Sequence, residues 1–144
     1  MSEQFDEIFD VLVIGSGCGG LTAALTADIS NPAKVLVIEK SHLIGGTSAT
    51  SGGVIWIPDN HLGKEKGAQD SISEAKDYLK ATIPADEFNE PLIDAYLDQG
   101  PKMVKFMQDH TDARYTSLEH YPDYFQDAPG VKLGNRALEP LPVS

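Results

Sequence analysis

The chain has 144 residues, of which 41% are hydrophobic and 23% are charged, and its formal net charge is −11. This composition is typical of a globular domain, and the acidic charge argues against nucleic acid or an anionic membrane as a partner. No apolar run approaches the ~20 residues of a membrane span, no signal peptide is visible, and the lone cysteine favours a reducing, cytoplasmic location.

The first predicted element is a strand over Val11–Ile14, an unbroken apolar run expected to be buried on both faces of a parallel sheet. The strand leads into Gly15, Gly17 and Gly20, which match the spacing G-x-G-x-x-G. In this pattern the first glycine permits a tight turn. The second lets the backbone approach a pyrophosphate, and the third lets a helix pack closely on the strand.

A helix is expected from Leu21 to about Ser30, where Asn31-Pro32 would stop it, followed by a buried strand over Val35–Ile38. Strand, glycine turn, helix and strand form one βαβ unit, which is the context that supports a dinucleotide site. Glu39 ends the second strand, where a carboxylate can accept hydrogen bonds from both hydroxyls of an adenosine ribose. The same carboxylate would repel a 2′-phosphate, which disfavours NADP.

Beyond the βαβ unit, the residues 41–53 predict a long loop rich in glycine and hydroxyl groups, a type that is usually functional. Residues 54–57 form a short apolar run, and residues 59–70 are interpreted as a polar loop. A capping box predicts a helix from Ser71 to about Ala81. Asn89 is expected to cap a further helix that Gly100-Pro101 interrupts, with a second helical segment over residues 102–109 and a turn-rich tail over residues 111–144.

The loop after the second strand favours FAD over NAD. A nicotinamide dehydrogenase normally continues from the acidic residue into another helix. Here Gly45-Gly46-Thr47-Ser48 and Ser51-Gly52-Gly53 follow instead, and their backbone N–H groups and hydroxyls can bind phosphate and ring carbonyl groups. A cofactor that extends across both glycine regions is long and carries a second ring system, as FAD does.

Residues 10–58 resemble the FAD-binding segment of the flavoproteins grouped with fumarate reductase and the succinate dehydrogenase flavoprotein. Within that group, the run from Gly45 to Asn60 is most similar to the 3-ketosteroid dehydrogenases. The stretch from Tyr121 to Phe125 and the turn from Gly134 to Pro140 also resemble that branch. The resemblance implies an α/β fold with a Rossmann-like FAD-binding βαβ unit of the glutathione-reductase type, followed by helices and a turn-rich tail.

The resemblance also implies which residues would contact FAD. The pyrophosphate would lie at the glycine turn, Glu39 would hold the ribose with Lys40 beside the adenosine, and the hydroxyl-rich loop would run toward the flavin ring. The implied contacts are Gly15, Ser16, Gly17, Gly19, Gly20, Glu39, Lys40, Thr47, Ser48, Ser51, Gly52 and Gly53.

For the ketosteroid Δ1-dehydrogenases the resemblance implies hydride transfer from the steroid A ring to flavin N5, while a tyrosine abstracts the neighbouring proton. The family position for that tyrosine is the second of a Tyr-Tyr pair, and this chain has Tyr124-Phe125. Phenylalanine cannot exchange a proton, so either Tyr121 or Tyr124 substitutes as the candidate catalytic residue, or the protein is not a Δ1-dehydrogenase in the strict sense. The alternative is that both tyrosines only pack a pocket wall or a core edge.

Other side chains carry weaker signals. Trp56 is expected either to line a substrate cavity or to be a core aromatic, and Asp123 is interpreted as a turn residue. Arg136 is expected either to pair with Glu139 or to contact the cofactor. Cys18 is interpreted as an inert packing residue, and no metal site is expected because no histidine has metal-ligand spacing.

We expect residues 1–60 to be the N-terminal part of an FAD-binding domain and residues 61–144 to lead toward a substrate domain that is absent, which makes the chain an N-terminal fragment. The first functional hypothesis is dehydrogenation of a CH–CH bond in a 3-ketosteroid-like small molecule. A fumarate reductase-like flavoprotein acting on a dicarboxylate is the second, although the chain has only two arginines with which to bind carboxylates. The third is a non-catalytic FAD-binding module.

Overall fold

The computed structural model describes residues 7–31 and 33–142, and the chain separates into two compact units, Met1–Gly53 and Val54–Ser144. This boundary lies earlier than the one expected after residue 60. Strand β3, Ile55–Trp56, pairs with strand β5, Ala137–Pro140, and therefore belongs to the second unit. No helix in the described part of the chain has both the length and the apolar character that a membrane crossing requires.

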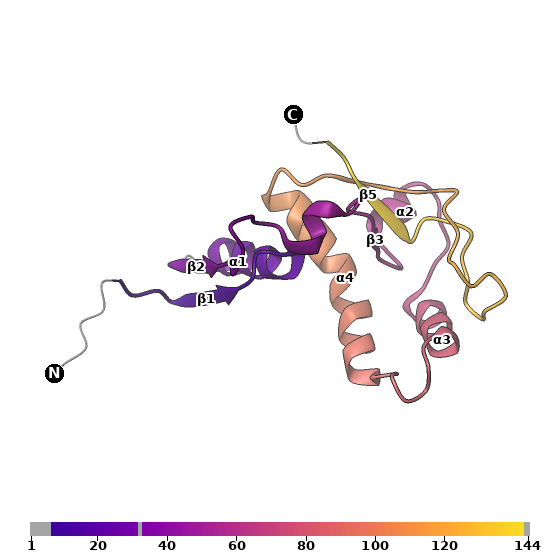
Figure 1. The fold of residues 1–144 in the computed structure, drawn as a ribbon. Coiled ribbons are helices and arrows are strands. Elements are labelled where there is room, and N and C mark those ends of the chain that lie inside the picture. Colours follow the sequence, from indigo (N-terminus) through magenta and orange to yellow (C-terminus); the bar gives the residue numbers. More distant parts are fainter. Residues whose placement is uncertain (1–6, 32, 143–144) are drawn as a thin grey trace. The chain divides into compact units, whose positions relative to one another are not determined.

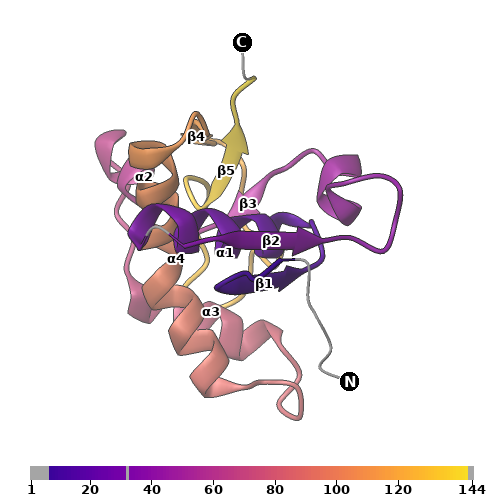
Figure 2. The same ribbon diagram turned by 90° about the vertical axis from the view of Figure 1, so that its left-hand side faces the viewer.

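The first unit contains the βαβ unit that the sequence predicts. Strands β1, Val11–Ile14, and β2, Val35–Ile38, pair in parallel, and helix α1, Cys18–Ser30, connects them. Figures 1 and 2 both show α1 running alongside the two strands. The helix begins before the expected start at Leu21, because Gly17 has the extended backbone of an N-cap and its carbonyl accepts a hydrogen bond from the Leu21 N–H.

The two strands are not buried on both faces, which corrects the expectation from their apolar runs. Helix α1 covers one face, where Val13 is 8% exposed. On these strands Leu12 is 56% exposed, Ile14 is 78% exposed and Ile38 is 42% exposed. The apolar runs predict that both faces of the strand pair are covered. Within the described residues, helix α1 covers one face.

The second unit is built on a three-stranded antiparallel sheet in the order β3-β5-β4, in which β4 is Tyr115–Ser117. The turn-rich tail expected over residues 111–144 therefore also contains the strands β4 and β5, which were not predicted from the sequence. The paired strands lie far apart in the chain, so no local sequence pattern predicts their pairing. Ile57, Val104 and Leu138 form the centre of the core beside this sheet.

Two short-range caps set the next helices. Helix α2, His61–Glu65, lies inside the region interpreted as a polar loop, which corrects that prediction. Its cap is Asn60, whose side-chain oxygen accepts a hydrogen bond from the backbone of the helix. Helix α3, Ile72–Thr82, confirms the predicted capping residue, because the Ser71 hydroxyl accepts from the Glu74 N–H.

Helix α4, Glu90–His110, is continuous, so the predicted interruption at Gly100-Pro101 was wrong. Asn89 caps the helix as expected. A proline within a helix costs about 3 kcal/mol or more, which the packing of this helix must offset. Gly100 helps, because the missing side chain lets Ile57 approach; a Cβ there would lie 3.3 Å from the Ile57 Cδ1. The buried face of the helix consists of Leu97, Gly100, Val104 and Met107.

Gly130 fixes the turn-rich tail against helix α3, and its replacement should be costly. Its φ is +71°, and a Cβ would overlap the Glu74 carbonyl. We expect Gly130→Ala to lower the free energy of unfolding by more than the ~1–2 kcal/mol of a left-handed alanine. Gly67→Ala is the matched control, because Gly67 has φ +83° but open space around it. Urea unfolding followed by Trp56 fluorescence measures both; equal losses would show that the close contact is unimportant.

Candidate functional site

The turn between β1 and α1 needs two of its glycines for its own geometry. Gly15 has φ +95°, and its N–H donates to the Ile38 carbonyl at 2.8 Å, which holds the end of β1 against β2. Gly20 packs against that turn so closely that a Cβ would overlap the Gly15 carbonyl oxygen. These contacts are the tight turn and the close helix–strand packing that the glycine pattern predicts.

At Gly17 and Gly19, neither the backbone conformation nor a close contact within the chain requires a glycine. Neither has a positive φ, a Cβ on Gly19 would meet nothing within 4 Å, and a Cβ on Gly17 would lie 4.0 Å from its nearest neighbour, the Ser48 hydroxyl. A ligand that approaches the backbone at this point would explain both glycines. The positive end of the α1 dipole favours an anion there, so these residues fit a pyrophosphate.

Glu39 lies against the same turn. Its Oε2 accepts hydrogen bonds from the Ser16 N–H at 2.9 Å and the Ser16 hydroxyl at 2.6 Å, and its Oε1 accepts from the Ser41 N–H at 3.0 Å. The hydroxyl of Ser16, with these backbone donors, lowers the pKa of Glu39 to about 2. A carboxylate has about four acceptor positions. One ribose hydroxyl therefore fits directly, and a second would replace one of the Ser16 bonds.

The glycine- and hydroxyl-rich loop folds onto this turn. It contains a short 3-10 helix, η1, over Gly46–Thr50. The Ser48 hydroxyl accepts a hydrogen bond from the Cys18 N–H at 3.2 Å, and the Gly45 N–H donates to the Ser16 hydroxyl at 2.9 Å. The loop and the first turn of α1 are thus joined through the residues for which a cofactor role is predicted.

The remaining predicted cofactor residues extend from this centre. Thr47 lies in η1, and its carbonyl accepts a hydrogen bond from a hydroxyl later in the same loop. The Ser51 hydroxyl accepts from the Gly53 N–H at 3.1 Å, and Gly52 has open space where a Cβ would be. The Lys40 side chain is exposed beside Glu39.

An aromatic pocket of about 330 Å³ lies in the second unit. This volume is at the lower end of the ~300–1,000 Å³ range of small-molecule sites. Both candidate tyrosines line the pocket. Trp56 also lines it, so of its two expected positions, in a cavity wall or in the core, the structure shows the cavity wall. The lining residues are Val54, Trp56, Tyr78, Leu79, Thr82, Tyr121, Pro122, Asp123, Tyr124, Phe125 and Ala137.

The two candidate tyrosines form a pair at this pocket. Their hydroxyl oxygens are 3.4 Å apart and their ring centroids are 6.5 Å apart. The hydrogen bond with Tyr124 raises the pKa of Tyr121. Tyr121 therefore favours its protonated form and is suited to donate a hydrogen bond, while Tyr124 can accept one.

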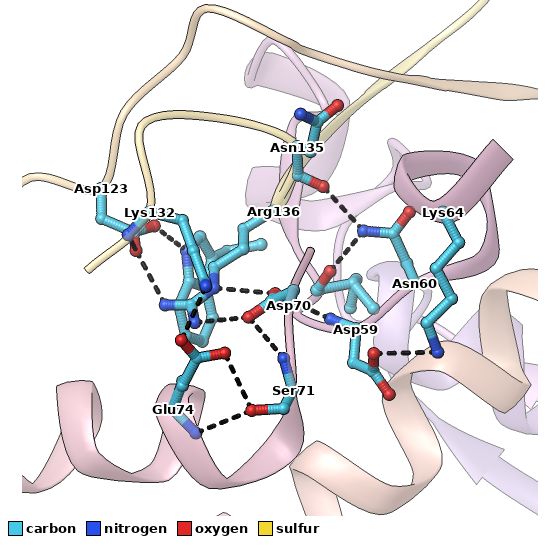
Figure 3. A network of polar contacts seen from close by, with 12 residues as sticks. Asp59, Asn60, Lys64, Asp70, Ser71, Glu74, Asp123, Lys132, Asn135 and Arg136 are labelled. Atoms are coloured by element: carbon cyan, nitrogen blue, oxygen red, sulfur yellow. Dashed lines mark hydrogen bonds and ion pairs between the residues drawn. The ribbon is translucent and has the colours of Figure 1, made fainter. Parts of the chain in front are cut away.

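A buried ion-pair network lies behind the pocket wall (Figure 3). Arg136 donates through Nε and Nη2 to both oxygens of Asp70, at 2.9 and 2.7 Å, and through Nη1 to Asp123 Oδ2 at 2.8 Å. The side chain of Arg136 is 1% exposed. Both expected roles for Arg136, pairing with Glu139 and contact with the cofactor, are corrected, because burial between two carboxylates satisfies its charge. Asp123 is an ion-pair partner rather than only a turn residue.

A family model described as "FAD binding domain" matches residues 10–137. The chain belongs to this family. The cofactor of the family is FAD, and the prediction of FAD from the second glycine region is confirmed.

The similar proteins of this FAD-binding family are larger. The 3-oxosteroid 1-dehydrogenase of Mycobacterium tuberculosis is 42% identical over 137 residues, which are 94% of this chain and 24% of that protein. The 4-oxocyclohexanecarboxylate 2-dehydrogenase of Sinomonas cyclohexanicum is 41% identical over 132 residues, or 92% of this chain and 23% of that protein. The chain spans about a quarter of the length of each.

A solved structure of a ketosteroid dehydrogenase is also similar to this chain. The crystal structure of 3-ketosteroid Δ1-dehydrogenase from Sterolibacterium denitrificans, in complex with 1,4-androstadiene-3,17-dione, has a TM-score of 0.83 and 42% identity. The match covers 92% of this chain and 23% of that one. The predicted resemblance to the 3-ketosteroid dehydrogenases is therefore confirmed.

Among the residues of the pocket and its support, Tyr78 and Asp70 are absent from the sequence-based predictions. Tyr78 lines the pocket and is 6% exposed. It follows the buried Ala75 by three positions on α3, so helical periodicity could have identified it. Asp70 carries no comparable signal, because its partner Arg136 is distant in sequence.

The two kinds of glycine in the turn between β1 and α1, at which FAD binding is predicted, lead us to expect opposite behaviour of their mutants. We expect Gly19→Ala to leave β1 and β2 intact, or to stabilise α1 by ~0.5–1 kcal/mol, while weakening FAD binding. Gly20→Ala should disrupt the turn itself. Amide hydrogen exchange in the two strands measures stability, and quenching of FAD fluorescence measures binding. Unchanged FAD affinity in Gly19→Ala would contradict the assigned role of Gly19.

Removing the buried cation should strongly destabilise the second unit. Arg136→Met leaves the carboxylates of Asp70 and Asp123 buried without their partner, and we expect a loss of about 3–5 kcal/mol. Lys105→Met is the control, because it breaks an exposed ion pair with Asp109, and exposed pairs contribute little to stability. Urea unfolding monitored by Trp56 fluorescence compares the two. A similar small loss in both variants would contradict the importance of the network.

Proposed function

We propose that this chain forms the nucleotide-binding part and a substrate-contacting wall of a longer FAD-dependent dehydrogenase. The proposed reaction removes hydrogen from a CH–CH bond beside a ring ketone, in a 3-ketosteroid or a related cyclic ketone. The observation that carries the proposal is the 42% identity with 3-oxosteroid 1-dehydrogenase over 94% of this chain. The single cysteine supports a cytoplasmic location for the enzyme.

The residues of the first unit would hold the cofactor. The glycine turn and the α1 dipole would bind the pyrophosphate, Glu39 would bind the ribose, and Lys40 would lie beside the adenosine. Thr47, Ser48 and the run Ser51-Gly52-Gly53 would bind toward the flavin through hydroxyl and backbone groups. When bound, FAD supplies a hydride acceptor at N5.

The aromatic pocket of the second unit would bind the ring system of the substrate. Its apolar and aromatic lining suits a neutral polycyclic ligand. Tyr124 would take the proton from the carbon beside the ketone, and Tyr121 would donate a hydrogen bond to Tyr124 as the charge develops. The resemblance to the Δ1-dehydrogenases places Phe125 where a tyrosine is expected, and its side chain can contribute only packing.

The contacts of the two arginines oppose the fumarate reductase-like alternative. A small dicarboxylate would need cationic side chains that are free to bind it. Arg136 is committed to Asp70 and Asp123. Arg114 donates to the backbone carbonyls of Gln108, Thr111 and Ala113.

An absorbance spectrum taken after incubation with FAD and gel filtration tests the cofactor role. We expect a flavin band that elutes with the protein, and its absence would oppose the first part of the proposal.

Trp56 is the single tryptophan and lines the pocket, so its fluorescence reports substrate binding. We expect 1,4-androstadiene-3,17-dione to quench it in a saturable manner, and fumarate to leave it unchanged. Quenching by fumarate instead would favour the dicarboxylate alternative.

The proposed roles of the tyrosines need a complete enzyme. A chimera can be made in which this chain replaces the matching segment of the Mycobacterium tuberculosis 3-oxosteroid 1-dehydrogenase. In the chimera we expect Tyr124→Phe to lower kcat about 10²–10⁴-fold, the usual contribution of a positioned general base. Tyr115→Phe serves as the control, because Tyr115 lies in β4 beside the core and outside the pocket. Equal activity of the two variants would exclude Tyr124 as the base.

A further inference from the structure

The stretch that carries the two pocket tyrosines has no regular secondary structure of its own. Residues 121–125 lie outside every helix and strand of the second unit. Neither a helix nor a strand ladder therefore fixes the directions of Tyr121 and Tyr124, and both side chains are exposed at the pocket. Something else must hold this segment if the two hydroxyls are to stay paired.

Asp123, between the two tyrosines, is the buried member of the stretch. Its side chain is 2% exposed. Its Oδ1 accepts from the Trp56 Nε1–H at 2.7 Å, and its Oδ2 accepts from Arg136 Nη1 at 2.8 Å and from the Lys132 N–H at 2.9 Å. The Asp123 N–H also donates to the Lys132 carbonyl at 2.9 Å. Both the side chain and the backbone of this residue are thus anchored.

The partner of Asp123 is itself fixed in place. Arg136 binds Asp70 through two parallel hydrogen bonds, a geometry that is both strong and directional. The guanidinium carbon lies 5.4 Å from the ring centroid of Trp56 and 5.9 Å from that of Tyr78. Figure 3 shows Arg136 between Asp70, next to the start of α3, and Asp123 in the aromatic stretch.

A second anchor follows two residues after Asp123. The Phe125 N–H donates to the hydroxyl of Tyr78 at 3.1 Å, and Tyr78 lies on α3. Tyr124 is therefore held between an anchored residue on each side. Its side chain reaches the pocket, while the side chain of Asp123 is buried and the backbone of Phe125 is bonded to α3.

We infer that Asp123 is a positioning residue for the tyrosine pair, and that the clamp formed by Arg136 and Trp56 on its carboxylate sets Tyr121 and Tyr124 at the pocket. The role as a positioning residue for catalysis rests on the proposed function, because it assumes that the tyrosines act on a substrate. Asp123 does not itself act on substrate, since its carboxylate is occupied by three donors.

Asp123→Asn tests the inference in the 144-residue chain without FAD or substrate. An amide in place of the carboxylate presents its N–H groups to at least one of the three donors, so the clamp is broken while the side-chain volume is kept. We expect the nuclear Overhauser effect between the Tyr121 and Tyr124 rings to be lost. We also expect the pKa of Tyr121, followed by ¹³C-tyrosine NMR, to fall toward the ordinary value, because the bond to Tyr124 raises it.

Asp70→Asn is the matched control. It also removes one carboxylate from Arg136, but the asparagine oxygen can still accept a hydrogen bond from the guanidinium, and no hydrogen bond of Asp123 involves Asp70. We expect it to lower stability while the ring contact and the pKa of Tyr121 stay as in the wild type. Equal loss of the tyrosine pair in both variants, or retention of the pair in Asp123→Asn, would overturn the inference.

A milder variant covers the case in which Asp123→Asn does not fold. Trp56→Phe removes the donor to Asp123 Oδ1, keeps an aromatic ring beside the guanidinium, and leaves the ion pair between Asp123 and Arg136. We expect a weaker ring contact and a lower pKa for Tyr121, and unchanged values would overturn the inference. Because these measurements involve no cofactor or substrate, their failure is distinct from the absence of a flavin band or of steroid quenching, which would oppose the proposed function.

Discussion

The guanidinium of Arg136 is the charge on which the polar interior of the second unit depends. Taking a cation out of water costs several kcal/mol, and that cost is recovered only when every donor has a good acceptor. Asp70 and Asp123 accept three hydrogen bonds from Arg136, and they come from two segments that are remote in sequence. The same interaction therefore joins the start of α3 to the aromatic stretch, and Trp56 and Tyr78 cover the guanidinium with their rings.

The parts of the fold that the sequence predicts are those with local causes. The strands on either side of α1 follow from apolar runs, and the turn between β1 and α1 follows from its glycine spacing. The cap at Ser71 is likewise a signal within four residues. The sheet β3-β5-β4 has no such signal, since its partners meet only after the chain has folded. At Gly100-Pro101 the local signal pointed to a break, and packing against Ile57 outweighed it.

The candidate sites also differ in whether their residues are close in sequence or meet only in the folded chain. The candidate FAD contacts could be proposed from the sequence because the turn, Glu39 and the hydroxyl-rich loop follow one another closely in the chain. The aromatic pocket was predicted only through Tyr121, Tyr124 and Trp56, each recognised by residue type. The ion pairs of Arg136 were missed because sequence proximity favoured Glu139, whereas burial selects partners by their position in space.

The open face of the β1–β2 pair affects how this chain behaves in solution. Exposed apolar side chains on a sheet tend to promote self-association, which like charges on separate molecules oppose. At neutral pH the net charge of −11 provides that repulsion. The isoelectric point is about 4.6, so in mild acid the repulsion vanishes while Leu12, Ile14 and Ile38 stay uncovered. The loss of this repulsion near the isoelectric point therefore favours self-association of the chain.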